Sequence, residues 1–330
     1  MHSSEQTSAT ANGKQQFEVA VLDDYQGVAL DLADWSSLHE GAKVTVFRDH
    51  IADADQLVER LLPYDVVCVM RERTPLPGVV LQRLPRLRLI ASTGSRNRSI
   101  DAEAASRLGI AIAHSGYAST PTIEFTWALI LGIARNIASE SESMRTGGWQ
   151  RFIGSDLAGK TLGILGLGNI GSQVATIGRA FGMNVIAWSQ NLTADRASAV
   201  GAEAVTKTEL LERSDFLSVH LILSGRTKGL IGAHELSVMK PTAYLINTSR
   251  GPIVDEQALV TALRSRRIAG AAVDVYEVEP LPLDHPFRTL PNVLATPHIG
   301  YVSRGLYETF YGDTVKNIQA WIAARLPQSA

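Results

Sequence analysis

The sequence contains a single cysteine, Cys68, among 330 residues, and it has no apolar run as long as a membrane helix. One cysteine excludes an intramolecular disulfide, and its place in the apolar run Val66–Met70 favours a buried core residue over a reactive thiol. The longest apolar run, Phe125–Ala134, is far shorter than the about 20 residues that a transmembrane helix needs. Residues 1–16 are polar, lack the apolar segment of a signal peptide and are expected to be disordered. These absences predict a cytoplasmic protein without a membrane partner.

An excess of charge of one sign is missing too. The chain has 31 Lys and Arg against 33 Asp and Glu, a net charge of −2, so no nucleic-acid partner is expected. Low-complexity tracts are absent, and no grouping of histidine, cysteine and acidic residues has the spacing of a metal site. At about 100–200 residues per domain, the length predicts two domains.

What the sequence does contain is an alternation of apolar, β-branched runs with helix-like stretches. Strands are expected at Phe17–Leu22, Lys43–Phe47, Val66–Met70, Leu89–Ser92, Thr161–Leu165, Asn184–Trp188, Phe216–His220, Ala243–Asn247, Gly270–Val275 and Val293–Ala295. Helices are expected at Leu57–Leu62, Asp101–Leu108, Pro121–Asn136, Asn169–Phe181, Glu256–Arg264 and Leu306–Ala324. Strand–helix alternation of this kind predicts an α/β protein with two doubly wound parallel-sheet domains.

A glycine motif follows the strand at Thr161–Leu165 and opens the next helix. Its residues are Gly166, Gly168, Asn169, Ile170 and Gly171. In a strand–turn–helix context the spacing G-x-G-x-x-G indicates a dinucleotide site. Gly166 permits the tight turn, Gly168 lets the backbone approach a pyrophosphate, and Gly171 lets helix and strand pack closely. The helix N-terminus then offers N–H groups and a positive dipole end to the phosphates.

The residue expected to bind the adenosine ribose ends the strand Asn184–Trp188. A carboxylate is usual there, since it binds both ribose hydroxyls of NAD and repels the 2′-phosphate of NADP. This sequence has Ser189, followed by Gln190 and Asn191, and the nearest downstream arginine is Arg196. The absence of the carboxylate predicts use of both cofactors, with NADPH equal or moderately preferred.

Three later strands each end in ionisable residues. Arg250 follows the strand Ala243–Asn247. Asp274 lies at the end of the strand Gly270–Val275, and Glu277 and Glu279 follow it. His298 follows the strand Val293–Ala295. The carboxyl ends of parallel strands meet at one edge of a sheet, where open α/β sheets bind ligands.

In these motifs and their order, the sequence resembles the D-isomer-specific 2-hydroxyacid dehydrogenases, with glyoxylate and hydroxypyruvate reductases among them, from about Glu18 to Ala320. The motifs that carry the resemblance are the glycine motif and the segments Asn247–Gly251, Asp274–Pro280 and Thr296–Gly300. The resemblance implies a Rossmann cofactor domain, a flavodoxin-like substrate domain and a cleft between them. It also implies a homodimer, with Pro121–Asn136 and the segment up to Trp149 at the interface.

The resemblance also implies roles for individual residues. Arg250, Glu279 and His298 form the implied catalytic trio. Implied cofactor contacts beyond the glycine motif are Ser189, His220, Thr227, Thr248, Asp274 and Gly300, with Asp274 on the nicotinamide carboxamide. Implied substrate contacts are Arg73, Arg250 and the backbone of Thr93, Gly94 and Ser95. Arg73 could equally be a solvated rim charge, and Glu277 is read as a surface residue.

The chemistry of reducing a 2-oxo acid fits this trio. The carbonyl oxygen needs a proton, and imidazole is the side chain that titrates near neutral pH, which makes His298 the natural acid. Glu279 would orient the imidazolium and keep it charged. Arg250 would bind the substrate carboxylate or carbonyl oxygen and stabilise negative charge in the transition state.

The two domains are expected to share the chain unequally. The substrate domain is predicted at 17–116 plus 299–330 and the cofactor domain at 117–298, so the chain crosses twice, near Tyr117 and near His298. Hinges at those points would close the cleft over the substrate and exclude water.

Three alternatives stay open. A formate dehydrogenase-like enzyme would have glutamine in place of the acid, so Glu279 argues against it. A phosphoglycerate dehydrogenase-like enzyme often carries an added regulatory domain, for which this chain is short. A nucleotide-sensing, corepressor-like binding protein retains the same trio, and only turnover would separate it from an enzyme. Leu221 replaces the family's usual proline, which is a minor departure.

Overall fold

The computed structural model describes residues 16–38 and 41–325 and divides into two compact units. Unit 1 comprises Met1–Ala118 and Ser303–Ala330, and unit 2 comprises Ser119–Val302. The divisions fall two and four residues after the predicted ones. The second lies later because Ile299 and Gly300 are hydrogen-bonded to Asp274 of unit 2. The disorder predicted for residues 1–16 falls almost wholly outside the described residues. The assignment of substrate and cofactor to the two units stays a prediction.

Unit 1 is built on a five-stranded parallel sheet in the order β2-β1-β3-β4-β5. Its strands are β1 (Phe17–Val21), β2 (Ala42–Val46), β3 (Val66–Val69), β4 (Leu89–Ser92) and β5 (Ala111–His114). Its helices are the 3-10 turn η1 (Trp35–Leu38), α1 (Ala54–Leu61), α2 (Gly78–Leu81), α3 (Ala102–Arg107) and α11 (Arg304–Ala323). This strand order is the flavodoxin-like one, which the fold prediction required.

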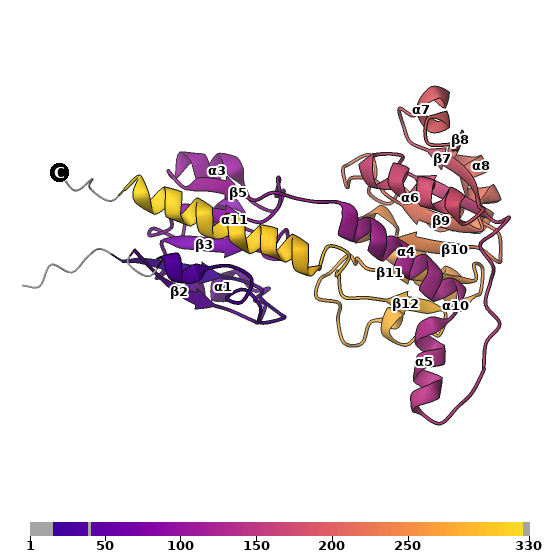
Figure 1. Ribbon diagram of the computed structural model, residues 1–330, viewed down its shortest axis with the longest axis horizontal. Helices are drawn as coiled ribbons and strands as arrows, with labels where there is room; N and C mark the ends of the chain where they lie inside the picture. The colour runs from indigo at the N-terminus through magenta and orange to yellow at the C-terminus, as the bar shows by residue number, and fades with distance from the viewer. Residues whose placement is uncertain (1–15, 39–40, 326–330) are drawn as a thin grey trace, which may run out of the picture. The chain divides into compact units, whose positions relative to one another are not determined.

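Alternate residues of this sheet enter two separate cores. Ala20, Val67 and Ile90 pack against α1, α2 and α3 on one face. On the other face α11 packs along β4 and β5 (yellow in Figure 1), and the Phe17 and Trp321 rings meet edge to face, 4.9 Å apart. Period-2 alternation of buried side chains on both faces is what a doubly wound sheet requires. It therefore explains why these strands read as continuous apolar runs.

Unit 2 is built on a seven-stranded parallel sheet in the order β12-β11-β10-β9-β6-β7-β8. Its strands are β6 (Thr161–Leu165), β7 (Asn184–Trp188), β8 (Glu203–Ala204), β9 (Phe216–Val219), β10 (Tyr244–Asn247), β11 (Gly270–Val273) and β12 (Val293–Ala295). Its helices are α4 (Thr120–Ala134), α5 (Ile137–Arg145), α6 (Asn169–Ala180), α7 (Ala194–Ser198), α8 (Lys207–Arg213), α9 (Ala233–Val238) and α10 (Glu256–Arg264), with 3-10 turns η2 (Gly251–Ile253) and η3 (Pro286–Arg288).

This sheet is also covered on both faces. Leu217, Leu245 and Ala271 point into a core with α8, α9 and α10. Their neighbours Phe216, Ile246 and Ala272 point into a second core with α4 and α6, and Figure 1 shows α4 and α6 together over the strands. The predicted fold class, two doubly wound α/β sheets, is confirmed. Within residues 16–38 and 41–325, no helix combines the length and apolar character needed to cross a membrane.

Candidate active site

The glycine motif forms the turn between β6 and α6 at the carboxyl edge of the unit 2 sheet. Gly166 has φ +107°, and a Cβ there would lie 2.7 Å from the carbonyl oxygen of His220, so only glycine fits this turn. Gly168 is the N-cap of α6, and no side chain caps this helix end. A Cβ on Gly168 would meet no atom within 4 Å, so this side of the turn is open.

This cradle fits the pyrophosphate of a dinucleotide. An uncapped helix start presents backbone N–H groups and the positive end of the helix dipole to an anion. The open space at Gly168 lets the ligand approach the backbone. Asn169 Nδ2 donates to Ser119 Oγ at 3.1 Å, which ties the first helical residue to the start of α4. Ile170 and Gly171 continue the first turn of α6.

Ser189 lies directly beside this cradle. The pairing of Leu165 with Trp188 brings the ends of β6 and β7 together, and Ser189 Oγ accepts the Leu167 N–H at 2.9 Å. The chain then turns, with the Leu192 N–H donating to the Ser189 carbonyl at 3.0 Å, and enters α7. Arg196 is exposed on α7, which packs near β8 (Figure 1).

The other predicted cofactor contacts are spread along the same edge. His220 directly follows β9, and its Nε2 lies 2.8 Å from Ser218 Oγ. Burial lowers the pKa of His220 to about 4, so its imidazole is neutral at pH 7. Thr227 closes the following loop by donating to the Ile222 carbonyl at 2.7 Å. Thr248 is buried, with its hydroxyl 2.9 Å from that of Thr126 on α4.

The structure brings Glu279 and His298 into direct contact. His298 Nδ1 lies 2.5 Å from Glu279 Oε2, and the other carboxylate oxygen accepts the Tyr276 N–H at 2.9 Å. Burial raises the pKa of Glu279, but the hydrogen bond and charge of His298, together with the Arg250 charge, hold it below its usual value. With Nδ1 engaged by a carboxylate, proton exchange with a substrate falls to Nε2.

Arg250 stands at the same edge, at the start of η2 after β10. Its guanidinium donates to the Ser249 carbonyl at 2.7 Å, and its charge acts on Glu279. Three strand ends, those of β10, β11 and β12, thus deliver the cation, the carboxylate and the imidazole to one region of unit 2. Glu277 is exposed, as its surface reading required.

Asp274 supports the turn that carries His298. Its carboxylate accepts hydrogen bonds from Thr296 Oγ1 at 2.6 Å, the Ile299 N–H at 2.9 Å and the Gly300 N–H at 2.8 Å. His298 itself has φ +53°, a left-handed conformation that costs a non-glycine residue energy and must be held by its surroundings. Burial raises the pKa of Asp274 despite these bonds. Both oxygens of the residue predicted to hold the carboxamide are therefore already hydrogen-bonded.

In unit 1, the predicted substrate turn follows β4. The Thr93 N–H donates to the Val69 carbonyl at 3.1 Å, and the Gly94 N–H donates to Ser115 Oγ at 2.7 Å. Of the three predicted backbone donors, Thr93 and Gly94 are thus engaged within the unit, whereas Ser95 has no hydrogen bond among those described for its N–H group.

Arg71 was not among the predicted site residues, yet its guanidinium lies over this turn. A Cβ on Gly94 would overlap with Arg71 Nη1, and Gly94 also has φ +82°. Arg71 additionally lies 5.1 Å from the centre of the Tyr117 ring. Nothing in the sequence separates Arg71 from Arg73, because both follow β3 within four residues.

Arg73, the predicted substrate contact, is held elsewhere in unit 1. Its guanidinium donates to the Asp23 carbonyl at 2.8 Å and to the Tyr307 hydroxyl at 3.3 Å, and it stacks over the Tyr25 ring at 4.6 Å. Asp23 is buried and pairs with His50 at 3.0 Å. These contacts of Arg73 are all with residues of unit 1.

Comparison with known proteins identifies a family whose model covers the ionisable residues Arg250, Glu279 and His298. Residues 127–300 match the family model of the D-isomer specific 2-hydroxyacid dehydrogenase, NAD binding domain. The chain is similar to a glyoxylate reductase of Aeropyrum pernix, 43% identical over 75% of this chain and 77% of the relative. It is 39% identical to a D-3-phosphoglycerate dehydrogenase of Methanocaldococcus jannaschii, over 74% of this chain and 47% of the relative.

A solved structure of phosphoglycerate oxidoreductase from Vibrio cholerae is also similar, with a TM-score of 0.89, 36% identity and coverage of 93% of this chain and 99% of that one. The chain spans about half the length of the D-3-phosphoglycerate dehydrogenases that it matches. The family match nonetheless extends over the glycine motif and every member of the ionisable edge. The chain therefore belongs to the D-isomer specific 2-hydroxyacid dehydrogenase family of NAD-dependent oxidoreductases.

Proposed function

We propose that this protein interconverts a small 2-oxo acid and the corresponding D-2-hydroxy acid, using NAD(P)H and NAD(P)⁺. The observation that carries the proposal is the 2.5 Å contact between His298 and Glu279 on the sheet that also bears the glycine cradle and Arg250. Relatives named glyoxylate reductase support reduction of a short 2-oxo acid.

In this mechanism the chain's own residues bind the acid and move one proton. Arg250 holds the substrate carboxylate or carbonyl oxygen by charge-assisted hydrogen bonds, which strengthen as negative charge develops on that oxygen. His298, hydrogen-bonded through Nδ1 to Glu279, gives its Nε2 proton to the carbonyl oxygen during reduction and takes it back during oxidation. The bound nicotinamide supplies the hydride that the carbonyl carbon receives. Gly166, Gly168, Asn169, Ile170 and Gly171 would hold the pyrophosphate.

On the side of unit 1, we propose that the turn Thr93–Ser95 binds the substrate carboxylate. Ser95 supplies the backbone donor that is not engaged elsewhere among the described contacts, and the Arg71 guanidinium over Gly94 adds a positive charge. Arg73 contributes by bracing Asp23 and Tyr25 beside the end of β3.

The test is a turnover assay with a panel of 2-oxo acids, among them glyoxylate, hydroxypyruvate and pyruvate, each with NADH and with NADPH. Chiral analysis of the product should give the D form. Production of the L form would contradict the proposed active site. Dinucleotide binding without turnover of any panel member would instead support the nucleotide-sensing alternative.

A second candidate is oxidation of 3-phosphoglycerate. The Arg71 guanidinium lies over the Gly94 turn, where it would attract a second anionic group such as a phosphate. Including 3-phosphoglycerate in the panel, in the oxidative direction, distinguishes the two candidates. Turnover of this substrate well above that of glycolate and glycerate would favour the second.

Cofactor choice depends on Ser189, and Ser189→Asp is expected to shift the ratio of kcat/KM values toward NADH by at least tenfold. A carboxylate at this place gains charge-assisted hydrogen bonds to the ribose hydroxyls, worth about 1.5–3 kcal/mol, and it repels a 2′-phosphate. About 1.4 kcal/mol suffices for a tenfold change. The wild type is expected to use both cofactors, with NADPH equal or moderately preferred.

Steady-state measurements with both cofactors on the two proteins give the ratio. Ser198→Asp, which adds the same charge at an exposed position of α7, serves as the matched control and should leave the ratio unchanged. A wild type with strong NADH preference, together with a variant of unchanged ratio, would show that Ser189 does not lie at the ribose.

We further propose that the protein is a cytoplasmic homodimer joined through α5 and the segment that follows it. This region exposes Ile137, Met144, Trp149, Phe152 and Ile153, with 48–99% of each side chain accessible. The segment is held in place, since Glu140 accepts the N–H groups of Arg151 and Phe152 at 3.0 and 2.8 Å. A preorganised apolar surface of this kind is typical of an interface.

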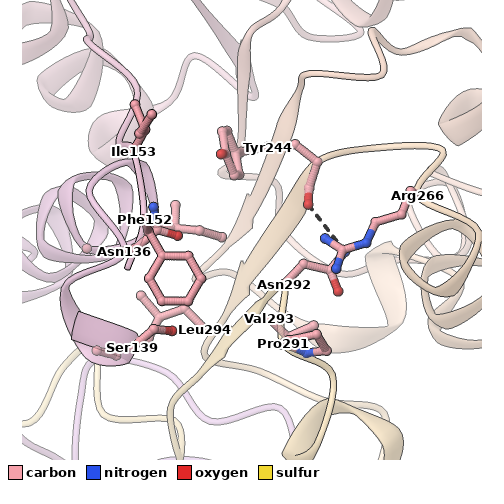
Figure 2. A pocket seen from close by; sticks show the side chains of 14 residues that line it. Asn136, Ser139, Phe152, Ile153, Tyr244, Arg266, Pro291, Asn292, Val293 and Leu294 are labelled. Atoms are coloured by element: carbon pink, nitrogen blue, oxygen red, sulfur yellow. Dashed lines mark hydrogen bonds between the residues drawn. The ribbon is translucent and has the colours of Figure 1, made fainter. Parts of the chain in front are cut away.

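A cavity of about 270 Å³ beside this surface would receive side chains of a second copy. Figure 2 shows Phe152 and Ile153 at this cavity with Tyr244 and Leu294 of the sheet.

Ile153→Asp is expected to convert the dimer to a monomer at micromolar concentration, because a twofold interface carries the new charge twice. Light scattering after size-exclusion chromatography measures the change. Leu283→Asp, at another exposed apolar position, is the control. A monomeric wild type or an unaffected variant would contradict the proposed interface.

A further inference from the structure

The loop that carries Glu279 connects β11 to η3 and is fastened at both ends to one carboxylate. Glu256, the first residue of α10, accepts the Glu277 N–H on Oε2 at 3.0 Å. Its other oxygen, Oε1, lies 3.1 Å from Nε2 of His285 at the far end of the loop. Both side chains are mostly buried, with 18% of Glu256 and 15% of His285 exposed.

The direction of the second hydrogen bond follows from the other ring nitrogen. His285 is the N-cap of η3, and its Nδ1 accepts the Phe287 N–H at 3.2 Å. A nitrogen that accepts a hydrogen bond carries no proton, so the proton of the neutral ring is on Nε2 and points at Glu256. The ring is also held edge to face against buried Phe287, with centroids 4.7 Å apart.

The Glu256 carboxylate therefore accepts a hydrogen bond from each end of the loop, and Glu279 lies between the two donor residues in the chain. The middle of the loop is held separately, since Arg288 donates to the carbonyls of Leu281 and Pro282 at 2.6 and 2.8 Å. Glu277 lies two residues before Glu279 in the chain. Holding the Glu277 backbone therefore limits how far the Glu279 carboxylate can move from His298. The 2.5 Å contact between Glu279 and His298 demands such restraint, because the carboxylate lies on an irregular loop.

We propose that Glu256 and His285 are positioning residues that hold Glu279 against His298 for proton transfer. This inference deepens the proposed function and rests on it for its kinetic consequences. Neither residue touches the trio in the described contacts; both act through the loop backbone. A carboxylate is required at 256 because both of its partners are donors, and a glutamine amide has only one acceptor oxygen to offer them.

The first test is Glu256→Gln, with Glu209→Gln as the matched control. Glu209 also lies in the first turn of a helix of unit 2, where it forms a capping box with Thr206, and it is exposed. For Glu256→Gln we expect kcat to fall about tenfold or more, with KM values for the 2-oxo acid and the cofactor changed less than about twofold. Glu209→Gln should keep the wild-type kcat.

A count of dinucleotide binding sites separates positioning from simple loss of structure. A positioning role predicts that Glu256→Gln binds the dinucleotide with wild-type stoichiometry in a fluorescence titration while kcat falls. Loss of folded protein would instead lower the number of binding sites in proportion to kcat.

A pair of histidine variants isolates the contact with Glu256. His285→Asn keeps an acceptor near the Phe287 N–H but cannot reach Glu256, whereas His285→Gln keeps a donor at the reach of Nε2. We expect the asparagine variant to behave like Glu256→Gln and the glutamine variant to retain kcat within about threefold of wild type. The double variant Glu256→Gln/His285→Asn should be no worse than Glu256→Gln alone, because Glu256→Gln already disturbs the contact that His285→Asn removes.

Amide hydrogen exchange over residues 276–286 tests the same restraint without turnover. Exchange there should be faster in Glu256→Gln and His285→Asn than in the wild type and in Glu209→Gln. Unchanged exchange and kcat in both loop variants would overturn the inference, and so would equal behaviour of the asparagine and glutamine variants. A wild type without turnover would instead defeat the proposed function, and the exchange result would still decide whether the restraint exists.

Discussion

His298→Ala is expected to lower kcat for 2-oxo acid reduction by about 10²–10⁴-fold, the usual contribution of a general acid. The imidazole is the group whose free nitrogen can deliver a proton to the carbonyl oxygen, since Nδ1 is engaged by Glu279. Cofactor affinity should stay nearly intact, because the glycine cradle lies at the ends of β6 and β7. In the sheet, β11, β10 and β9 separate β6 from β12, the strand that His298 follows. Dinucleotide binding measured by fluorescence titration, beside steady-state kinetics, separates the two effects.

The control for this variant is His234→Ala, which removes an exposed histidine of α9. It should leave both kcat and dinucleotide affinity at wild-type values. Undiminished turnover of glyoxylate and hydroxypyruvate by His298→Ala would remove His298 from the role of acid. A loss of dinucleotide affinity as large as the loss of turnover would show that the side chain supports the cofactor site instead.

Arg250→Lys is expected to lower kcat/KM by about 10²-fold or more, although the charge is conserved. A guanidinium offers a planar pair of donors to a carboxylate or to a carboxylate and carbonyl oxygen together, and an ammonium cannot reproduce that geometry. Loss of a donor to a developing negative charge typically costs about 10²–10³-fold. The substitution also removes the hydrogen bond from Arg250 to the Ser249 carbonyl, which orients the side chain.

Steady-state kinetics with the best substrate of the panel, at saturating cofactor, measure this loss. Arg264→Lys, at an exposed position near the end of α10, is the matched control and should have no effect. Near-normal KM and kcat in Arg250→Lys would show that no two-pronged contact with the substrate exists. The Arg250 charge also helps to keep Glu279 ionised, and lysine retains that charge, so the pH profile should change little.

Much of the fold could be predicted because buried parallel strands leave a plain signal. The strands Leu89–Ser92, Thr161–Leu165, Asn184–Trp188 and Val293–Ala295 have the predicted bounds. Most others were predicted one or two residues too long, since apolar residues such as Met70 and Val275 stay buried beyond the end of the ladder, and β2 was predicted one residue too late. Strands β5 and β8 were not predicted, because they are exposed edge strands in which alternation of apolar residues is weak.

The end of α4 shows a further limit. The helix was predicted to Asn136 but ends at Ala134, and Asn136 takes a left-handed conformation with φ +52° before α5 begins at Ile137. No glycine or proline marks this break, so its cause is tertiary. The Ser155 N–H donates to the Ala134 carbonyl at 2.7 Å, and this contact from a residue 21 positions later takes the place of the next helical hydrogen bond.

Patterns along the chain were enough to predict the family, the two α/β sheets and the residues that carry the proposed chemistry. Motif order and strand periodicity are local properties of the chain, which is why Arg250, Glu279 and His298 could be named without a structure. The contacts between side chains could not be predicted in this way: Asp274 holds the turn of His298, Arg71 rather than Arg73 lies over Gly94, and Glu256 holds the loop of Glu279. These contacts join strand ends and loops 20 or more residues apart, and no periodicity along the chain records which side chain faces which.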